Sequence, residues 1–217
     1  MKTMEAVVVI LVVALGVSII ANFALYAYYT GGTTNLNETF PLSGSATGAS
    51  GLNLSIALNR ASIMPGQGIE VTISETNTLG TANTVSVASD WQFSPLSDSP
   101  CGVGSYPMGI AICQGYYTAS DISSAEALWV YSYGVYACPM LEQLIASYTF
   151  QPLSNMASIN SGPPFNSSYT QPINATLSAN GYWGMTAKDF HSFSPGIYTV
   201  VGGDEWGQLV LLHFLVV

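Results

Sequence analysis

Residues 6–29 form an apolar run of 24 residues without a single charged side chain. As an α-helix with a rise of about 1.5 Å per residue, this run reaches roughly 36 Å, which exceeds the hydrocarbon thickness of a bilayer. The apolar core of a cleaved signal peptide is shorter, at about 7–15 residues. The run therefore predicts one uncleaved N-terminal transmembrane α-helix within residues 1–29.

Basic residues are distributed unequally about this run. Lys2 precedes it, whereas the residues that follow contain only two basic side chains, Arg60 and Lys188. Because positively charged flanks remain in the cytoplasm, we expect a cytoplasmic N-terminus and an extracellular C-terminal portion. The sequence thus predicts a single-pass protein of the cell membrane, with membrane lipid as the partner of its helix.

The portion after residue 29 is acidic and poor in charge, with eleven acidic and two basic residues. Binding to nucleic-acid phosphates requires clustered Lys and Arg, so this composition excludes a nucleic-acid partner. Charged residues make up only 7% of the chain, and Ser, Thr, Asn, Gly and Tyr supply most of its polar groups. A fold that relies little on ionised carboxylates is expected to keep its stability in an acidic exterior.

Hydrophobic periodicity divides the rest of the chain. Residues 30–51 are rich in Gly, Ser and Thr, show no apolar period and predict a flexible linker. Apolar residues then alternate at 52–58 and 69–74, and a third strand is expected at 84–87, which together predict a β-meander. Residues 52–217 are expected to form one domain, with an irregular middle section at about 92–170.

Two hairpins are expected in the last part of this domain. The Asn180-Gly181 pair is typical of a type I′ turn, here between strands ending near Leu177 and starting near Tyr182. Residues 195–201 and 208–217 form the second hairpin around a Gly-rich turn. Its last strand is apolar on both faces apart from His213, so we expect it to be covered on both sides.

The segment PGIYTV at residues 195–200 resembles the penultimate strand of immunoglobulin-like domains, in which a tyrosine hydroxyl bonds back to the backbone. The segment SIMPGQ at residues 62–67, followed by the strand at 69–74, is similar to the start of such domains. The whole chain resembles archaeal single-anchor surface proteins with immunoglobulin-like heads. This resemblance implies an all-β fold, an immunoglobulin-like antiparallel β-sandwich preceded by one N-terminal transmembrane α-helix.

Three cysteines in an oxidising exterior predict one disulfide and one free thiol, and three pairings are open. We favour Cys101 with Cys138, because both lie beside prolines at the edges of loops that can adjust to the bond. Cys113 lies in an apolar segment and is expected to be buried and free. The exported portion also carries four N-glycosylation sequons, at Asn37, Asn53, Asn166 and Asn174.

Motifs of catalysis are missing from the sequence: it has no nucleophile elbow, phosphate-binding loop, HExxH or CxxC. We therefore expect no enzyme and no cofactor. A metal site could form only if the last hairpin brings acids and histidines together. The candidates are Asp189, His191, Asp204, Glu205 and His213. We favour roles in packing and turn capping for these residues.

Aromatic residues are the candidates for interaction. Trp129 and Tyr131 lie in a Tyr-rich stretch, and Trp206 lies in the turn of the last hairpin. Flat rings stack on sugars and anchor protein interfaces, whereas the alternative is ordinary packing in a sandwich core. A tryptophan at a hairpin tip either folds over the sheet or meets a partner.

Three functional hypotheses remain. The leading one is a non-catalytic membrane-anchored surface protein whose β-sandwich contacts envelope proteins or glycans, or associates with itself. The second is a filament subunit, since Lys2, Glu5 and the long apolar run resemble the start of archaellins and type IV pilin-like subunits, although no glycine marks a processing junction. The third is an accessory subunit of a membrane complex.

Overall fold

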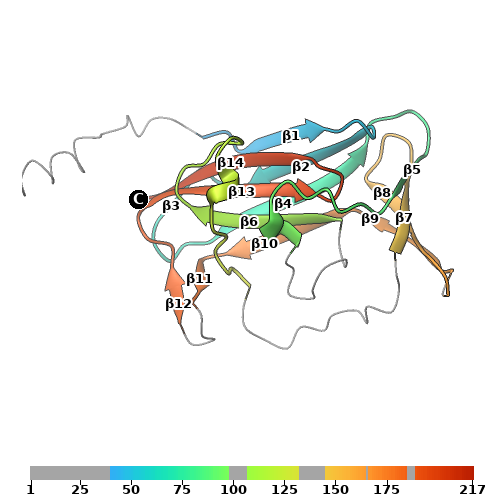
Figure 1. Ribbon diagram of the computed structural model, residues 1–217. Helices are drawn as coiled ribbons and strands as arrows, with labels where there is room; N and C mark the ends of the chain where they lie inside the picture. The colour runs from blue at the N-terminus through green and yellow to red at the C-terminus, as the bar shows by residue number, and fades with distance from the viewer. Residues whose placement is uncertain (1–39, 98–106, 132–144, 165, 185–188) are drawn as a thin grey trace, which may run out of the picture. The chain divides into compact units, whose positions relative to one another are not determined.

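In a computed structural model, the structure describes residues 40–97, 107–131, 145–164, 166–184 and 189–217. These residues form an all-β fold, which confirms the predicted class (Figure 1). The membrane helix expected within residues 1–29 lies outside the described part, which begins at residue 40. Within the described ranges, no helix has both the length and the apolar character needed to cross a bilayer.

The first sheet contains four antiparallel strands in the order β1-β2-β4-β10. Its strands are β1 (Ser43–Thr47), β2 (Leu52–Leu58), β4 (Ile69–Asn77) and β10 (Asn174–Ala179). Alternate residues of β2 are buried, as are the odd-numbered residues of β4. The period-two prediction for residues 52–58 and 69–74 is therefore confirmed, and it fixes which side chains face the core.

The second sheet has the order β3-β14-β13-β6. It contains β3 (Ser62–Ile63), β6 (Met108–Gln114), β13 (Gly196–Asp204) and β14 (Leu209–Val216). β14 pairs antiparallel with β13 and parallel with the short β3. The final hairpin is confirmed, and its last strand lies inside the sheet between two neighbours, as expected from its apolar character.

These two sheets face each other across one hydrophobic core, in which Leu54, Ile56, Ile73, Val200 and Phe214 are at most 1% exposed. Gly202 on β13 lies close to the opposite sheet, where a Cβ added to it would lie 2.8 Å from Ile56 Cδ1. The two layers thus pack face to face in a β-sandwich arrangement.

A third antiparallel sheet, in the order β5-β7-β8-β9, lies at one end of the sandwich (Figure 1). Its strands are β5 (Asn83–Ser86), β7 (Ile145–Phe150), β8 (Met156–Ser161) and β9 (Ser168–Pro172). The small pair β11 (Gly181–Trp183) and β12 (Phe190–Ser192) is separate. Two short 3-10 helices occur in the connections, η1 (Ser94–Ser97) and η2 (Ile122–Ser124).

Three local predictions differ from the structure. Residues 43–47, inside the expected linker, form the edge strand β1. The third strand of the expected meander, β5, pairs with β7 and leaves the first sheet. Asn180-Gly181 joins no hairpin, because β10 pairs with β4 whereas β11 pairs with β12. In each case the local pattern gives a strand or turn, while the choice of partner is made by distant residues.

The tyrosine bond expected at the start of the penultimate strand is present. The buried Tyr198 hydroxyl donates to Ser194 O at 3.0 Å and accepts from Ser194 N–H at 2.9 Å. Its ring stacks on Phe214 with a centroid separation of 5.1 Å. The hydroxyl thus ties the corner before β13 to the strand itself.

Candidate functional site: a hydroxyl-rich groove and a buried carboxyl pair

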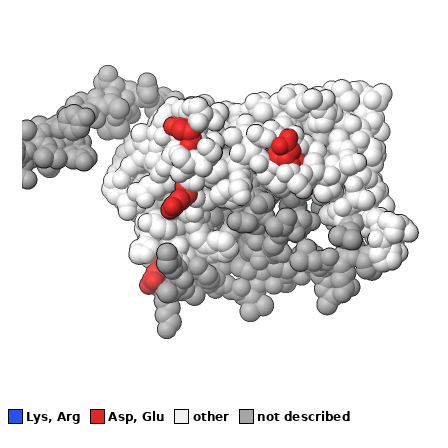
Figure 2. Space-filling model, viewed as in Figure 1, with Lys and Arg blue, Asp and Glu red and all other residues white. Residues whose placement is uncertain are grey.

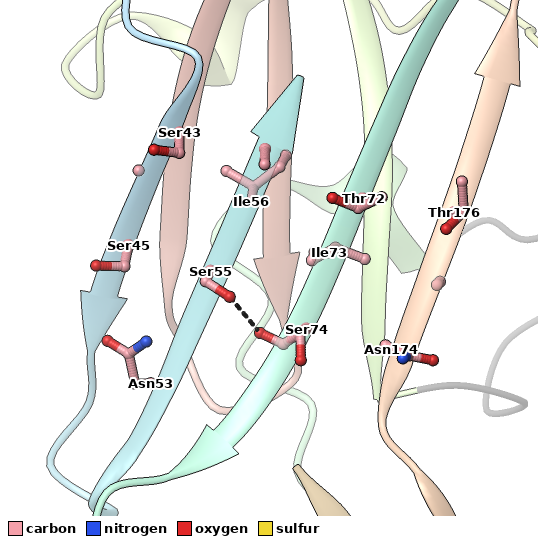
Figure 3. Close-up of a pocket in the computed structure, with 13 residues that line it drawn as sticks. Ser43, Ser45, Asn53, Ser55, Ile56, Thr72, Ile73, Ser74, Asn174 and Thr176 are labelled. Carbon is pink, nitrogen blue, oxygen red and sulfur yellow. Dashed lines mark hydrogen bonds between the residues drawn. The ribbon is translucent and has the colours of Figure 1, made fainter. Parts of the chain in front are cut away.

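The outer face of the first sheet is a shallow polar groove of about 750 Å³. It crosses all four strands and is lined by small side chains, among them Ser45, Asn53, Ser55, Thr72, Ser74 and Thr176 (Figure 3). Because side chains alternate along a strand, the residues between the buried Leu and Ile positions must all point to this side. The sequence pattern that builds the core therefore also builds the groove.

The groove offers hydroxyl and amide groups and no charge. Some of these groups bond within the sheet: Asn53 Oδ1 accepts from Thr47 at 2.9 Å. Ser55 donates to Ser74 O at 3.3 Å (Figure 3). None of the residues that line the groove is an acid, a base or a thiol. Such a surface suits hydrogen bonding to a neutral polar partner and does not suit acid–base or nucleophilic chemistry.

Charge is sparse on the described surface in general. On the side shown in Figure 2 the acidic residues form separate spots, and no Lys or Arg is visible among the described residues. Arg60 is the one basic residue of the described ranges, and it is exposed. The described surface therefore has no basic cluster that would attract phosphates.

Two predicted sequons lie in the groove itself. Asn53 on β2 and Asn174 on β10 both line it, and so do Ser55 and Thr176, the hydroxyl residues of the same sequons. Asn174 is exposed at the start of an edge strand, whereas Asn53 is half-buried in an inner strand. Asn166 is exposed in the turn between β8 and β9, and Asn37 lies outside the described residues.

The aromatic candidates Trp129 and Tyr131 lie close together, beside the small pair of strands β11 and β12. Their rings meet edge to face at 5.8 Å, and Trp129 is 36% exposed. Trp129 also forms an isolated bridge with Trp183 of β11, whose ring contacts the exposed Phe190 at 5.1 Å. The structure thus gathers four rings from two separate segments at one place on the surface.

Trp206 has a different environment. Its ring is half-buried and meets Tyr148 and Phe150 edge to face, at 5.6 Å and 6.2 Å. Its indole N–H donates to Ser86 O at 2.8 Å. Of the two roles that a tryptophan at a hairpin tip can take, the structure has the ring folded over a sheet, where it joins the last hairpin to the third sheet.

Sequence reasoning missed a carboxyl pair inside the sandwich, formed by Glu75 and Asp204, both 0% exposed. The two carboxyls interact with each other, and Gln208 Nε2 bridges them, donating to Asp204 Oδ2 at 2.6 Å and to Glu75 Oε1 at 3.5 Å. Burial raises the pKa of Glu75 to about 9, and the neighbouring Asp204 charge adds to this effect. The signal was available, because the alternation that buries Ile69, Val71 and Ile73 also places residue 75 inward.

Glu205 is the third buried acid, at 5% exposed. Burial is the main cause that raises its pKa to about 7, and the Asp204 charge also contributes, while a hydrogen bond from the Ala88 N–H opposes the shift. Its Oε1 atom has no hydrogen-bond partner. Two adjacent buried carboxyls, Asp204 and Glu205, therefore lie where β13 ends, and an oxygen of the second has no donor.

The acids and histidines considered for a metal do not come together. His213 pairs with Thr199 across the hairpin, its ring stacks on Tyr116 at 4.2 Å, and its Nε2 contacts Tyr117 O at 2.9 Å. His191 is exposed on β12 and lies beside Tyr182. Among the residues that the structure describes, no group of three or more His, Cys, Asp or Glu side chains is placed to hold a metal ion.

The cysteines are described only in part. Cys113 on β6 is 0% exposed and free, as expected for the apolar segment around it. Burial raises the pKa of its thiol to about 11, so the reactive thiolate is disfavoured. Cys101 and Cys138, the pair favoured for the disulfide, both lie outside the described residues.

Comparisons with known proteins add little to this picture. No protein-family model matches the chain, and no curated protein matches it. Among solved structures, the β-glucosidase EmGH1 from Erythrobacter marinus matches at a TM-score of 0.34 and 14% sequence identity, over 82% of this chain and 16% of the enzyme chain. A likeness of this size carries no argument about fold or activity.

Proposed function

We propose that this chain is a non-catalytic surface protein, held in the membrane by residues 6–29, whose β-sandwich contacts envelope proteins or glycans outside the cell. The apolar run and the lack of basic residues after it support the anchored, outward-facing arrangement. The proposal needs no cofactor and assigns no reaction to the described residues.

The groove on the first sheet is the observation that carries this proposal. Its lining of Ser, Thr and Asn spans four strands and has no charged residue. A partner that binds there must be recognised by hydrogen bonds and shape, which suits a neutral polymer such as a glycan or an extended polypeptide. Two sequons within the lining add to the case for an exported face.

An immunoglobulin-like fold is part of the same proposal. Two observations support it, the tyrosine bond at Tyr198 and the strand order, in which the short β3 runs parallel to the final strand of the sheet that contains β13 and β6. Domains of this kind commonly serve as contact modules on cell surfaces. The third sheet, β5-β7-β8-β9, is then an addition to the immunoglobulin-like arrangement.

Site-specific crosslinking on intact cells tests the proposal. A photoreactive residue at Thr72, in the groove, is compared with one at the exposed Ser168 on β9. We expect position 72 to capture an envelope component and position 168 to capture none. The thiol added by Thr72→Cys should also react with a membrane-impermeant maleimide before the cells are lysed. Labelling of this variant should exceed that of the unsubstituted chain. Reaction only after lysis would refute the outward arrangement.

A filament subunit is the second candidate, favoured by the apolar run that precedes a β-sandwich. In that case the helices pack together in the filament core, and the short leader Met1-Lys2 is removed by processing. N-terminal sequencing of the protein from cells separates the two candidates. An intact Met1 supports the single-anchor protein, whereas a chain that starts at Thr3, after the leader Met1-Lys2, supports the filament.

A further inference from the structure

The buried carboxyl pair connects the two sheets of the sandwich at one end. Glu75 lies on β4 of the first sheet, opposite Leu54 of β2. Asp204 ends β13 of the second sheet, and Gln208 immediately precedes β14. Gln208 Oε1 also accepts from Leu54 N–H at 3.3 Å. One amide and two carboxyls therefore join β2 and β4 to the last hairpin.

The distribution of donors shows that the pair needs a proton. Asp204 accepts from Gln208 N–H at 2.7 Å, from Trp206 N–H at 3.1 Å and from Gln208 Nε2 at 2.6 Å. Glu75 has only the 3.5 Å contact to Gln208, and its Oε2 atom has no partner. Two carboxylates repel each other, whereas a protonated Glu75 can donate to Asp204. The proton therefore belongs on Glu75.

No cation in the described structure can replace that proton. The donors that bond to the pair are Gln208 N–H, Gln208 Nε2 and Trp206 N–H, all of them neutral and all from the last hairpin. The nearest other acid along the chain is Glu205, which adds negative charge. Asp90 approaches the same turn at Gly207. Arg60 precedes β3, which pairs with the end of β14 that lies away from Gln208. At roughly 3.3 Å per residue along β14, that end is about 25 Å from Gln208.

We propose that Glu75 and Asp204 form a proton-dependent clasp between the two sheets, closed when they share a proton and loosened when both are ionised. The clasp makes acid the stabilising condition for this domain. It is independent of the proposed surface contact, since it lies inside the sandwich and the groove lies on its outer face. A protein exposed to an acidic exterior would hold its head rigid there and relax it in a more alkaline medium.

The direction of the pH effect follows from linkage. The pKa of Glu75 is about 9 when folded and 4.5 as its ordinary value, so the folded state retains a proton that the unfolded chain releases. The stabilisation is complete below pH 4.5 and is lost as the pH rises through the folded value. Between these limits the unfolding equilibrium constant should rise about tenfold per pH unit for one retained proton.

The test uses the full chain in mild detergent. Urea unfolding, followed by tryptophan fluorescence, is measured at several pH values between 4.5 and 9. We expect the unfolding constant to increase with pH in the unsubstituted chain. In Glu75→Gln, the amide can donate to Asp204 but carries no titrating proton. For each pH unit, the factor by which the unfolding constant increases should therefore be about ten times smaller than in the unsubstituted chain. Infrared spectroscopy at about pH 8, above the folded pKa of Glu205 and below that of Glu75, should show a protonated carboxyl band that Glu75→Gln strongly reduces.

Glu70→Gln is the matched control, because Glu70 is exposed on the same strand. It should leave both the pH series and the infrared band unchanged. The clasp is overturned if the unfolding constant of the unsubstituted chain is flat or falls with pH, or if the two variants behave alike. Should Glu75→Gln fail to fold, the pH series and the infrared band are measured in Glu205→Gln, in which the other buried acid with a raised pKa no longer titrates. A flat pH series and no protonated carboxyl band in that variant would overturn the clasp.

Discussion

Polar residues have opposite roles in two regions of the domain. One region is the outer face of the first sheet, and the other is the end of the sandwich that holds the buried carboxyl pair. On the outer face, exposed positions such as Ser45 and Thr72 carry hydroxyls that do not titrate near neutral pH. Inside, Glu75 and Asp204 are titratable and have no exposed surface. The comparison shows that pH acts on this domain mainly through its interior, and that a hypothesis of pH tolerance based on surface composition is incomplete.

The two regions also differ in how much a lost hydrogen bond costs. An exposed hydroxyl exchanges a protein partner for water at little cost in free energy. Leaving a buried polar group without a partner lowers the free energy of unfolding by about 1–3 kcal/mol. Replacing groove residues should therefore change contacts and leave stability almost intact. Replacing residues of the buried carboxyl pair should change the free energy of unfolding and its dependence on pH.

Asp204→Ala should have the largest effect. The substitution leaves Gln208 N–H, Trp206 N–H and the Gln208 amide without their acceptor. We expect a loss of about 4 kcal/mol in the free energy of unfolding in mildly acidic buffer, from several unsatisfied buried donors. Urea unfolding of the full chain measures it. A loss below about 1 kcal/mol would show that water enters this end of the sandwich and replaces the bonds.

Glu205→Gln should have a smaller effect that depends on pH. The pKa of Glu205 is about 7 when folded and 4.5 as its ordinary value, so its stabilising contribution is complete below pH 4.5 and is lost as the pH rises through 7. The unsubstituted chain should lose about 2 kcal/mol more across this window than the variant, in which Glu75 still titrates but Glu205 does not. Thermal unfolding at the two ends of the window checks this, with Glu126→Gln as the exposed control.

Thr72→Ala should change the free energy of unfolding by no more than about 0.5 kcal/mol at any pH, because Thr72 is exposed in the groove. Crosslinking from a photoreactive residue at the neighbouring Ser74 should nevertheless decrease if the groove is the contact surface. Thr170→Ala, exposed on β9, is the control and should leave crosslinking unchanged. Equal crosslinking in both variants would remove the groove from the proposed function.

Asn174→Gln should affect stability least of all. We expect a glycan on Asn174, which is exposed on an edge strand, and none on Asn53, whose side chain lies in an inner strand and accepts from Thr47. Mass spectrometry of glycopeptides from the protein isolated from cells measures both sites. A glycan on Asn53 with a bare Asn174 contradicts the prediction, and two bare sites argue against export through a glycosylating pathway.

Several elements were predictable because their signal is local. The alternation at Leu52–Leu58 and Ile69–Asn77 sets the buried face of each strand whatever its neighbours are. The tyrosine of the PGIYTV segment bonds to Ser194, only four residues earlier in the chain. The edge strand β1 was missed because its small residues, SGSAT, lack the apolar alternation that a buried face produces.

Predictions that required a partner were less successful. The strand near residues 84–87 exists, but it pairs with β7, more than sixty residues away. The Asn180-Gly181 pair has the right turn chemistry, yet the strands on its two sides belong to different sheets. Cys113, in contrast, was correctly placed in the core, since a short apolar segment is enough to bury a thiol.

By itself, the sequence determined the all-β class, the inward and outward faces of the main strands, and the low charge of the head. Only the tertiary structure decided which strands pair and that Glu75 meets Asp204, 129 residues later in the chain. The reason is physical: backbone geometry fixes the direction of each side chain locally, whereas the environment of a buried acid depends on the groups that distant segments bring to it. The chemistry of the interior therefore belongs to the fold, while the chemistry of the outer face can be read from the strand pattern alone.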